Sequence, residues 1–301
     1  MEKFEMLLQH GDHFKPMEKI HFHHKLAPGV YGLTPTQDGF LFTKTKTETD
    51  KLVHIPGTTY DLVVSEIDQF MKPETRALFD KYGFLYKRSA LLYGPPGSGK
   101  TCTINRIMEK VVGDGGIVLF NPHPRLVKQA FAALDMLQPE TRIMVVFEEL
   151  DELLKQHESE LLNLLDGQIQ KSNVIYMATT NFIDKIPTRI RRPGRFASVI
   201  EVKFPTAEAR HYYLSKKMQI EDSLLVEWVE KTENFSIDEL KETVLAVKCL
   251  GLSLDYTINK IRENKGMTAL NVIDEDPFCD DDCDEDEGPE SPLADVSFPK
   301  K

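Results

Sequence analysis

Short apolar runs alternate along the middle of this chain with stretches of helical periodicity. Five such runs are predicted as strands, and each pair is separated by enough residues for a helix. Alternation of this kind is typical of a mainly parallel sheet with helices on both faces, so we expect an αβα sandwich of the α/β class with five strands. The predicted strands cover residues 90–93, 116–121, 143–148, 174–179 and 198–202.

The pattern changes on both sides of this region. Before it, strand-like runs lie between turn-rich pieces, which predicts a small β-containing N-terminal module. After it, strand signals disappear and helical periods take over, which predicts a small all-helical domain. We therefore divide the chain into an N-terminal module (1–57), a sandwich domain (58–205), a helical domain (206–268) and a tail (269–301).

Composition and terminal sequence narrow the class of protein. The chain has 301 residues, of which 41% are hydrophobic, so it can bury one large core or two moderate ones. No run approaches the roughly 18 consecutive apolar residues of a membrane span, and the first residues lack a signal-peptide pattern. The four cysteines are scattered or lie in the tail, which fits a reducing compartment. We therefore expect a cytoplasmic protein without a membrane span.

The formal net charge of −11 is concentrated in the tail. The stretch from Asp274 to Asp295 carries twelve acidic residues and no basic one, so the rest of the chain is nearly neutral. Its few apolar residues cannot offset the entropy of ordering, so we expect an acidic, disordered tail. The charge distribution therefore argues neither for nor against a nucleic-acid partner.

The octapeptide GPPGSGKT follows one predicted strand and opens a helical pattern, which is the context of a phosphate-binding P-loop. Its glycines allow backbone N–H groups to point at a phosphate, and the helix N-terminus adds a positive dipole. Lys100 is expected to reach the β- and γ-phosphates, and the hydroxyl of Thr101 to bind Mg²⁺. We therefore predict ATP and Mg²⁺ as cofactors. The predicted nucleotide-binding residues are Gly94, Pro95, Pro96, Gly97, Ser98, Gly99, Lys100, Thr101 and Cys102.

Two carboxylates, Glu148 and Glu149, follow the apolar run 143–147. In a P-loop sheet, a carboxylate at the end of a neighbouring strand lies beside the phosphates. We assign Glu148 to the hydrated Mg²⁺ and Glu149 to the attacking water, which it orients and deprotonates. The alternative is a strand that runs into an acidic helix start. The P-loop upstream in the same alternating pattern favours the functional interpretation.

Two further segments carry polar groups suited to phosphate chemistry. Asn181 follows the predicted strand 174–179, where its side chain can hydrogen-bond the attacking water or the γ-phosphate; a turn-forming Asn is the alternative. Residues 188–196 hold a dense arginine cluster, and a guanidinium at the γ-phosphate neutralises charge that develops in the transition state. The alternative is a basic surface patch. The other three motifs favour a catalytic role.

Four segments, LLYGPPGSGKT, VVFEELDE, MATTN and IPTRIRRPGRF, occur in this order and together resemble the AAA ATPases. The resemblance covers about residues 60–250, and the last segment resembles the family's second region of homology. It implies a five-stranded nucleotide domain followed by a helical lid, with the nucleotide between them. It further implies a homo-oligomeric ring, commonly a hexamer, in which Arg192 and Arg195 act as catalytic residues on the neighbour's ATP.

The chain departs from the family pattern in several places. Glu148-Glu149 replaces the usual Asp-Glu pair, and residues 120–128 lack the aromatic-apolar-Gly signature of members that thread polypeptides. We therefore expect no threading by this loop. The acidic pair and the Lys-Arg before the P-loop strand resemble the mitochondrial Rieske-protein translocase subfamily, although this sequence shows no membrane anchor of that kind.

These motifs are compatible with two functions. The preferred one is an ATP hydrolase that remodels a macromolecular client, with a protein client preferred over nucleic acid. The alternative is a nucleotide-gated binding module, such as a loader or adaptor, which uses ATP as a switch and hydrolyses it slowly. A small-molecule kinase is a weaker third interpretation, because it leaves Asn181 and the arginine cluster unexplained.

Overall fold

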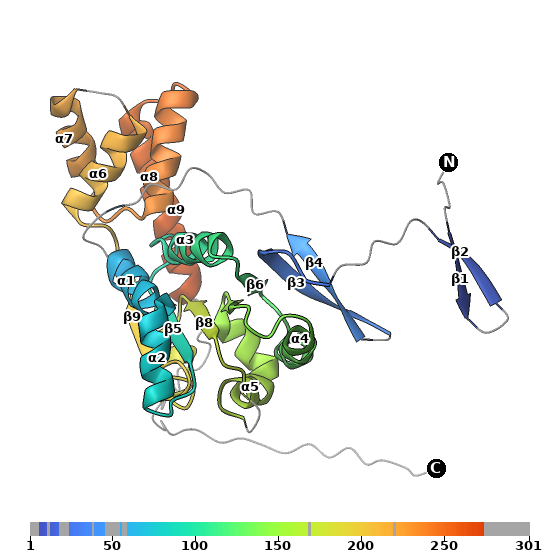
Figure 1. Ribbon diagram of the computed structural model, residues 1–301. Helices are drawn as coiled ribbons and strands as arrows, with labels where there is room; N and C mark the ends of the chain where they lie inside the picture. Colours follow the sequence, from blue (N-terminus) through green and yellow to red (C-terminus); the bar gives the residue numbers. More distant parts are fainter. Residues whose placement is uncertain are drawn as a thin grey trace, which may run out of the picture.

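A seven-stranded sheet lies at the centre of the protein (Figure 1). The computed structural model describes residues 6–10, 13–17, 24–37, 39–45, 55, 59–167, 170–218 and 221–273. The strand order is β4-β3-β6-β7-β8-β5-β9, and every neighbouring pair is parallel except β3 with β4. The strands are β3 (Gly29–Thr36), β4 (Gly39–Thr45), β5 (Lys87–Tyr93), β6 (Ile117–Phe120), β7 (Ile143–Phe147), β8 (Val174–Thr180) and β9 (Ser198–Glu201).

Helices cover both faces of this sheet, as the alternating pattern predicts (Figure 1). Helices α4 and α5 pack on one face, and α1 and α3 pack on the other. The molecule is therefore an α/β sandwich. The elements of this region are α1 (Thr59–Met71), α2 (Pro73–Lys81), α3 (Lys100–Gly113), α4 (Pro124–Leu137), α5 (Leu150–Asp166) and the short 3₁₀ turn η1 (Ile183–Lys185).

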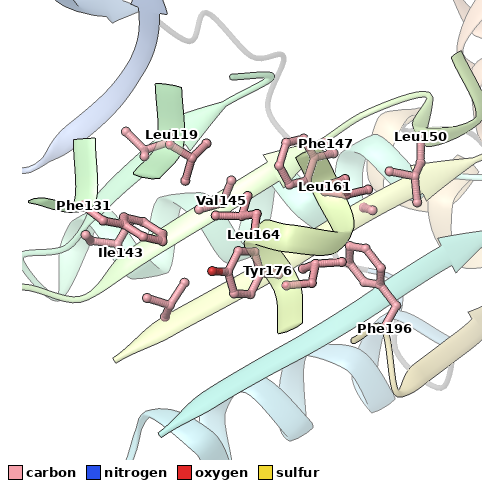
Figure 2. Close-up of a cluster of buried hydrophobic side chains, with 14 of the residues drawn as sticks. Leu119, Phe131, Ile143, Val145, Phe147, Leu150, Leu161, Leu164, Tyr176 and Phe196 are labelled. Atoms are coloured by element: carbon pink, nitrogen blue, oxygen red, sulfur yellow. The ribbon is translucent and has the colours of Figure 1, made fainter. Parts of the chain in front are cut away.

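The strand β7 shows why polar groups collect at one edge of the sheet. Val145 and Phe147 pack in the core beneath α4 and α5 (Figure 2), whereas Met144 and Val146 pack in the core beneath α1 and α3. Both faces of a central parallel strand are covered, so the whole strand is apolar and buried. The first position after β7 that can carry a charge is therefore Glu148, which directly follows the last strand residue, Phe147.

The sheet has seven strands rather than the five predicted, because β3 and β4 join it. Strand β3 pairs with β6 in parallel, with Val30 opposite Val118 and Tyr31 opposite Leu119. Tyr31 is buried, and its hydroxyl donates to the Ala27 carbonyl at 2.7 Å. The sequence shows both strands locally but not their distant partner, which depends on tertiary pairing. The predicted domain boundary at residues 57/58 stays a prediction, but strands from both sides of it belong to the same sheet.

After β9, the described residues form only helical elements, which we call the helical lid. The lid has its own apolar core, which includes Trp228, Phe235 and Leu240. Helix α8 begins with a reciprocal capping box between Ser236 and Glu239, which satisfies donors at its N-terminus. The elements are α6 (Ala207–Lys217), α7 (Asp222–Lys231), α8 (Ile237–Val244), the π-helical turn η2 (Leu245–Cys249) and α9 (Leu254–Ile273).

Strands β1 (Met6–His10) and β2 (His13–Met17) pair antiparallel in a two-stranded sheet of their own. The acidic segment from residue 274 onward, for which disorder is predicted, lies outside the described residues. Among the helices that the structure describes, none combines the length and the apolarity that crossing a bilayer requires.

The pairing of β3 with the central sheet generates the first prediction. Tyr31→Ala should lower the free energy of unfolding of the whole sandwich by about 3 kcal/mol, because it leaves a cavity beneath α4. Urea denaturation followed by circular dichroism measures this change. Leu41→Ala on β4, where the side chain is 58% exposed, is the matched control and should change stability little. An unchanged urea midpoint for Tyr31→Ala would show that β3 does not support the sandwich.

Candidate functional site

The carboxyl ends of three parallel strands bring the predicted motifs together at one edge of the sheet. The register pairs Tyr93 of β5 with Thr180 of β8, and Phe147 of β7 with Ala178 of β8. The P-loop, the acidic pair and Asn181 directly follow these strand ends. Strand β8 lies between β5 and β7, so Asn181 emerges between the P-loop and the two glutamates.

Lys100 is the first residue of α3, and its ammonium group lies inside the P-loop. The Nζ atom donates to the carbonyls of Gly94 and Pro95, both at 2.8 Å. Burial lowers the pKa of Lys100, and the nearby Asp238 carboxylate opposes this shift. The loop therefore already encloses a positive charge, and the phosphate oxygens of a nucleotide would be stronger acceptors for it than neutral carbonyls.

Two buried oxygen atoms at this edge have no hydrogen-bond partner within the described chain. They are Ser98 Oγ in the P-loop and Glu148 Oε1 after β7. A buried polar atom without a partner costs about 1–3 kcal/mol, so such atoms in native proteins call for an ion, water or ligand. Thr101, in the first turn of α3, is exposed. These groups fit a nucleotide with Mg²⁺: Ser98 and Lys100 would hold phosphates, and Thr101 and Glu148 the hydrated ion.

The turns after β6 and β7 have an unusual backbone conformation. Glu149 lies in the left-handed region (φ 50°), forms the N-cap of α5 and donates its N–H to Thr179 Oγ1 at 3.3 Å. Asn121 is also left-handed (φ 44°), and its Oδ1 accepts the N–H of Glu148 at 2.7 Å. Such conformations cost non-glycine residues roughly 1–3 kcal/mol and cluster at functional sites. The exposed Glu149 carboxylate is held at this edge by the turn.

Asn121 is a residue of the site that the sequence interpretation missed. The signal that identifies Asn181, a polar residue directly after a buried strand, applies equally to Asn121 after β6. Its contact with Glu148 joins two neighbouring strand ends. Only the strand order, which places β6 beside β7, shows that this side chain reaches the acidic pair.

The start of lid helix α8 lies directly on the P-loop. The Ile237 N–H donates to the Gly97 carbonyl at 3.1 Å. Gly97 has φ 71°, and a Cβ atom there would lie 2.6 Å from Ser236 Oγ and 3.3 Å from Asp238 Oδ2. The Ser236–Glu239 capping box explains why the helix begins here, but no local sequence pattern shows what that end of the helix contacts. A main-chain hydrogen bond therefore joins the start of the lid helix to the P-loop.

The arginine segment lies away from the P-loop of its own chain. Arg195 donates from Nη1 to the Arg189 carbonyl at 2.6 Å and pairs through Nε with Asp166 at 3.5 Å. Its own carbonyl accepts from Ser89 Oγ. Ser89 lies four residues before Tyr93, so roughly 13 Å of strand separates it from the edge that carries the P-loop.

Arg192 differs from Arg195 in its surroundings. Its side chain is exposed, and its guanidinium has no hydrogen bond or ion pair with any part of the chain that the structure describes. An exposed guanidinium is only weakly hydrated, so it can readily bind an anionic group on another molecule. The structure therefore brings Lys100, Glu148, Glu149 and Asn181 together at one edge and leaves the predicted arginines outside it.

A glycine-rich loop between a buried strand and a helix, with carboxylates after a neighbouring strand, defines the class of P-loop nucleoside triphosphatase domains. Residues 90–204 match the model of the ATPase family associated with various cellular activities (AAA). This match confirms, for residues 90–204, the resemblance drawn from the four motifs. The closer likeness to Rieske-protein translocases stays a prediction.

Several characterised proteins are similar to this chain. The vesicular-fusion protein SEC18 of Saccharomyces cerevisiae is 29% identical over 238 residues, which cover 66% of this chain and 30% of SEC18. The proteasome-activating nucleotidase of Saccharolobus solfataricus is 26% identical over 269 residues, or 75% of this chain and 65% of that protein. Cell division control protein 48 homolog B of Arabidopsis thaliana is 28% identical over 169 residues, or 47% and 28%. The chain thus spans less than two thirds of each.

The contact between Gly97 and the lid generates the second prediction. Gly97→Ala should detach the start of α8, because the added methyl group would overlap Ser236 Oγ. Hydrogen exchange at the Ile237 amide should rise by at least about tenfold, which corresponds to roughly 1.4 kcal/mol of lost protection. The matched control is Gly99→Ala, which also has positive φ (99°) but no atom within 4 Å of the new methyl group. Equal exchange in both variants would mean that backbone strain, not lid contact, is responsible.

Proposed function

We propose that this chain is an ATP-hydrolysing subunit of a homo-oligomeric ring that remodels a protein client. One observation carries the proposal: the P-loop, the acidic pair and Asn181 share one edge of the sheet, whereas the arginine segment lies far along the strand from it. Each chain then offers half of a catalytic site at one edge and the complementary arginines elsewhere. A ring, with a hexamer as the expected size, lets each subunit complete the site of its neighbour.

Within one subunit, four side chains have distinct roles in hydrolysis. Lys100 would bind the β- and γ-phosphates, and Glu148 with Thr101 would hold a hydrated Mg²⁺, which would supply neutralising charge. Glu149 accepts a proton from the attacking water, and its fixed turn keeps the carboxylate at the strand edge. Asn181 orients that water from the end of β8, which lies between the strands that precede the P-loop and the acidic pair.

The arginines complete the site from the neighbouring subunit. The exposed Arg192, which has no partner on the described part of its own chain, is the better candidate for contact with the γ-phosphate. Arg195, tied to Asp166 and to the Arg189 carbonyl, supports the loop that presents Arg192 and adds positive charge behind it. A second cation near the phosphate further stabilises the charge that develops in the transition state.

A protein client is supported by the relatives. The names of two of them describe vesicular fusion and activation of the proteasome. The predicted N-terminal module (1–57) and the acidic segment are the parts that we assign to client recognition.

A second candidate is a nucleotide-gated switch that hydrolyses ATP slowly. Glu148 favours it, because its longer side chain places the carboxylate differently from the usual Asp. The Gly97 contact supplies a route by which a bound nucleotide could shift the lid. Multiple-turnover ATPase assays separate the two candidates. A remodelling machine releases phosphate continuously, whereas a switch hydrolyses about one ATP per subunit and then slows.

The roles assigned within one subunit generate the third prediction. Lys100→Ala should abolish ATP binding, whereas Glu149→Gln should bind ATP and lower kcat at least about 100-fold, because the general base is lost. Isothermal calorimetry and a coupled phosphate-release assay measure these two properties.

The control for the base is Glu152→Gln. Glu152 is an exposed carboxylate in the same helical turn that pairs with Lys155, so its loss should leave kcat unchanged. Normal turnover by Glu149→Gln would remove Glu149 from the base role and leave the P-loop assignment intact.

Completion of the site by a neighbour generates the fourth prediction. Arg192→Ala and Glu149→Gln subunits are each inactive alone, but a mixture should recover ATPase activity. At some interfaces an intact Glu149 on one subunit meets an intact Arg192 on the next. Steady-state phosphate release at varied mixing ratios measures the recovery.

The matched control mixes Lys100→Ala with Glu149→Gln. Both changes lie in the half of the site that carries the P-loop and the acidic pair, so no subunit in that mixture has this half intact and no activity should return. Recovery in neither mixture, with wild-type turnover independent of protein concentration, would show that each chain hydrolyses ATP alone.

A further inference from the structure

A buried hydroxyl lies between the two catalytic segments that the proposed function invokes. Thr180, the last residue of β8, is 1% exposed. Its hydroxyl donates to Asp151 Oδ1 at 2.7 Å, and its Oγ1 accepts the N–H of Phe182 at 3.0 Å. The residue between Thr180 and Phe182 is Asn181. One side chain therefore fixes the backbone on both sides of the asparagine.

The acceptor of this hydroxyl belongs to the segment that carries the proposed base. Asp151 is 6% exposed and lies in the first turn of α5, two residues after Glu149. Glu149 itself is joined to the same strand, because its N–H donates to Thr179 Oγ1. The two consecutive threonines at the end of β8 therefore both contact the segment after β7: Thr179 accepts from Glu149, and Thr180 donates to Asp151.

The contact has the physical properties of a stiff connection. A hydroxyl that donates to a carboxylate forms a charge-assisted hydrogen bond, which is shorter and stronger than a neutral one. Burial strengthens it further, because little water competes for either group. Neither Asp151 nor Thr180 belongs to the P-loop or to α3, which carry the phosphate-binding groups. A change in this contact therefore acts on the water side of the site and not on nucleotide affinity.

We infer that Asp151 and Thr180 are positioning residues, which hold the general base Glu149 and the water-orienting Asn181 at the spacing that hydrolysis requires. The inference rests on the roles proposed above for Glu149 and Asn181. It assigns to the pair a contribution to kcat and none to the binding of ATP. A displacement of about 1 Å in such a constellation costs up to roughly 100-fold in rate.

The test begins with Thr180→Val, which keeps the shape of the side chain and removes the hydroxyl. We expect kcat to fall at least about 30-fold, within the range set by a displacement of that size. The Kd for a non-hydrolysable ATP analogue should change less than twofold. Thr180→Ser keeps the donor and should retain most of the wild-type kcat. A Thr180→Val enzyme with normal kcat, or one whose loss lies in Kd, would overturn the inference.

A purely structural effect is separated by a double variant. Thr180→Val leaves a buried carboxylate without its partner, which lowers stability on its own. In Asp151→Leu/Thr180→Val both partners are apolar, so the melting temperature should recover while kcat stays low. Recovery of kcat together with the melting temperature would reduce the pair to a stability role and overturn the inference.

Two controls complete the experiment. Thr257→Val, in α9 of the lid, removes the hydroxyl of a side chain that is 4% exposed and donates to the Ser253 carbonyl, so it should affect stability without a specific loss of kcat. Glu149→Gln is assayed in parallel. If Glu149→Gln is inactive and Thr180→Val is fully active, the positioning inference alone fails. If Glu149→Gln is active, the proposed base fails, and the inference fails with it.

Discussion

The parallel placement of β8 between β5 and β7 is the constraint on which the candidate site depends. Parallel strands end at the same edge, so this order brings the P-loop, Asn181 and the acidic pair together from segments far apart in the sequence. All residues of β7 and β8 are buried, and those of β7 are all apolar, so the acidic pair could not lie further back along its strand. The hydrophobic core thereby decides where the polar chemistry occurs.

Polar and backbone features that are costly for stability gather at that edge. Glu149 and Asn121 adopt left-handed conformations, and Ser98 and Glu148 each bury an oxygen atom without a partner in the described chain. Such features persist only where the surrounding structure compels them. Here the two cores beneath the sheet supply that support, and the features coincide with the positions to which nucleotide chemistry is assigned.

Two further parts of the chain bear on the site: the helical lid, which contacts it, and the arginine segment, which lies away from it. The main-chain contact between Gly97 and the start of α8 connects the phosphate loop to the lid, so a change at the loop can be transmitted to a second packed unit. The arginine segment is held against the amino-terminal half of β5, distant from the P-loop of its own chain. This separation is the physical basis for proposing that neighbouring subunits complete one another.

The sequence by itself determined the α/β class, five of the seven strands of the sheet, the P-loop and the acidic pair, because each depends on local periodicity or on a short motif. Only the tertiary structure decided that β3 and β4 extend the sheet, that Asn121 reaches Glu148, and that Ser236 contacts Gly97. Those contacts join residues at least 27 positions apart along the chain, and no local pattern encodes which distant surface a strand or helix end will meet. The bridge from Thr180 to Asp151 is of the same kind: both residues lie in recognised motifs, but their hydrogen bond exists only because two buried strands end side by side.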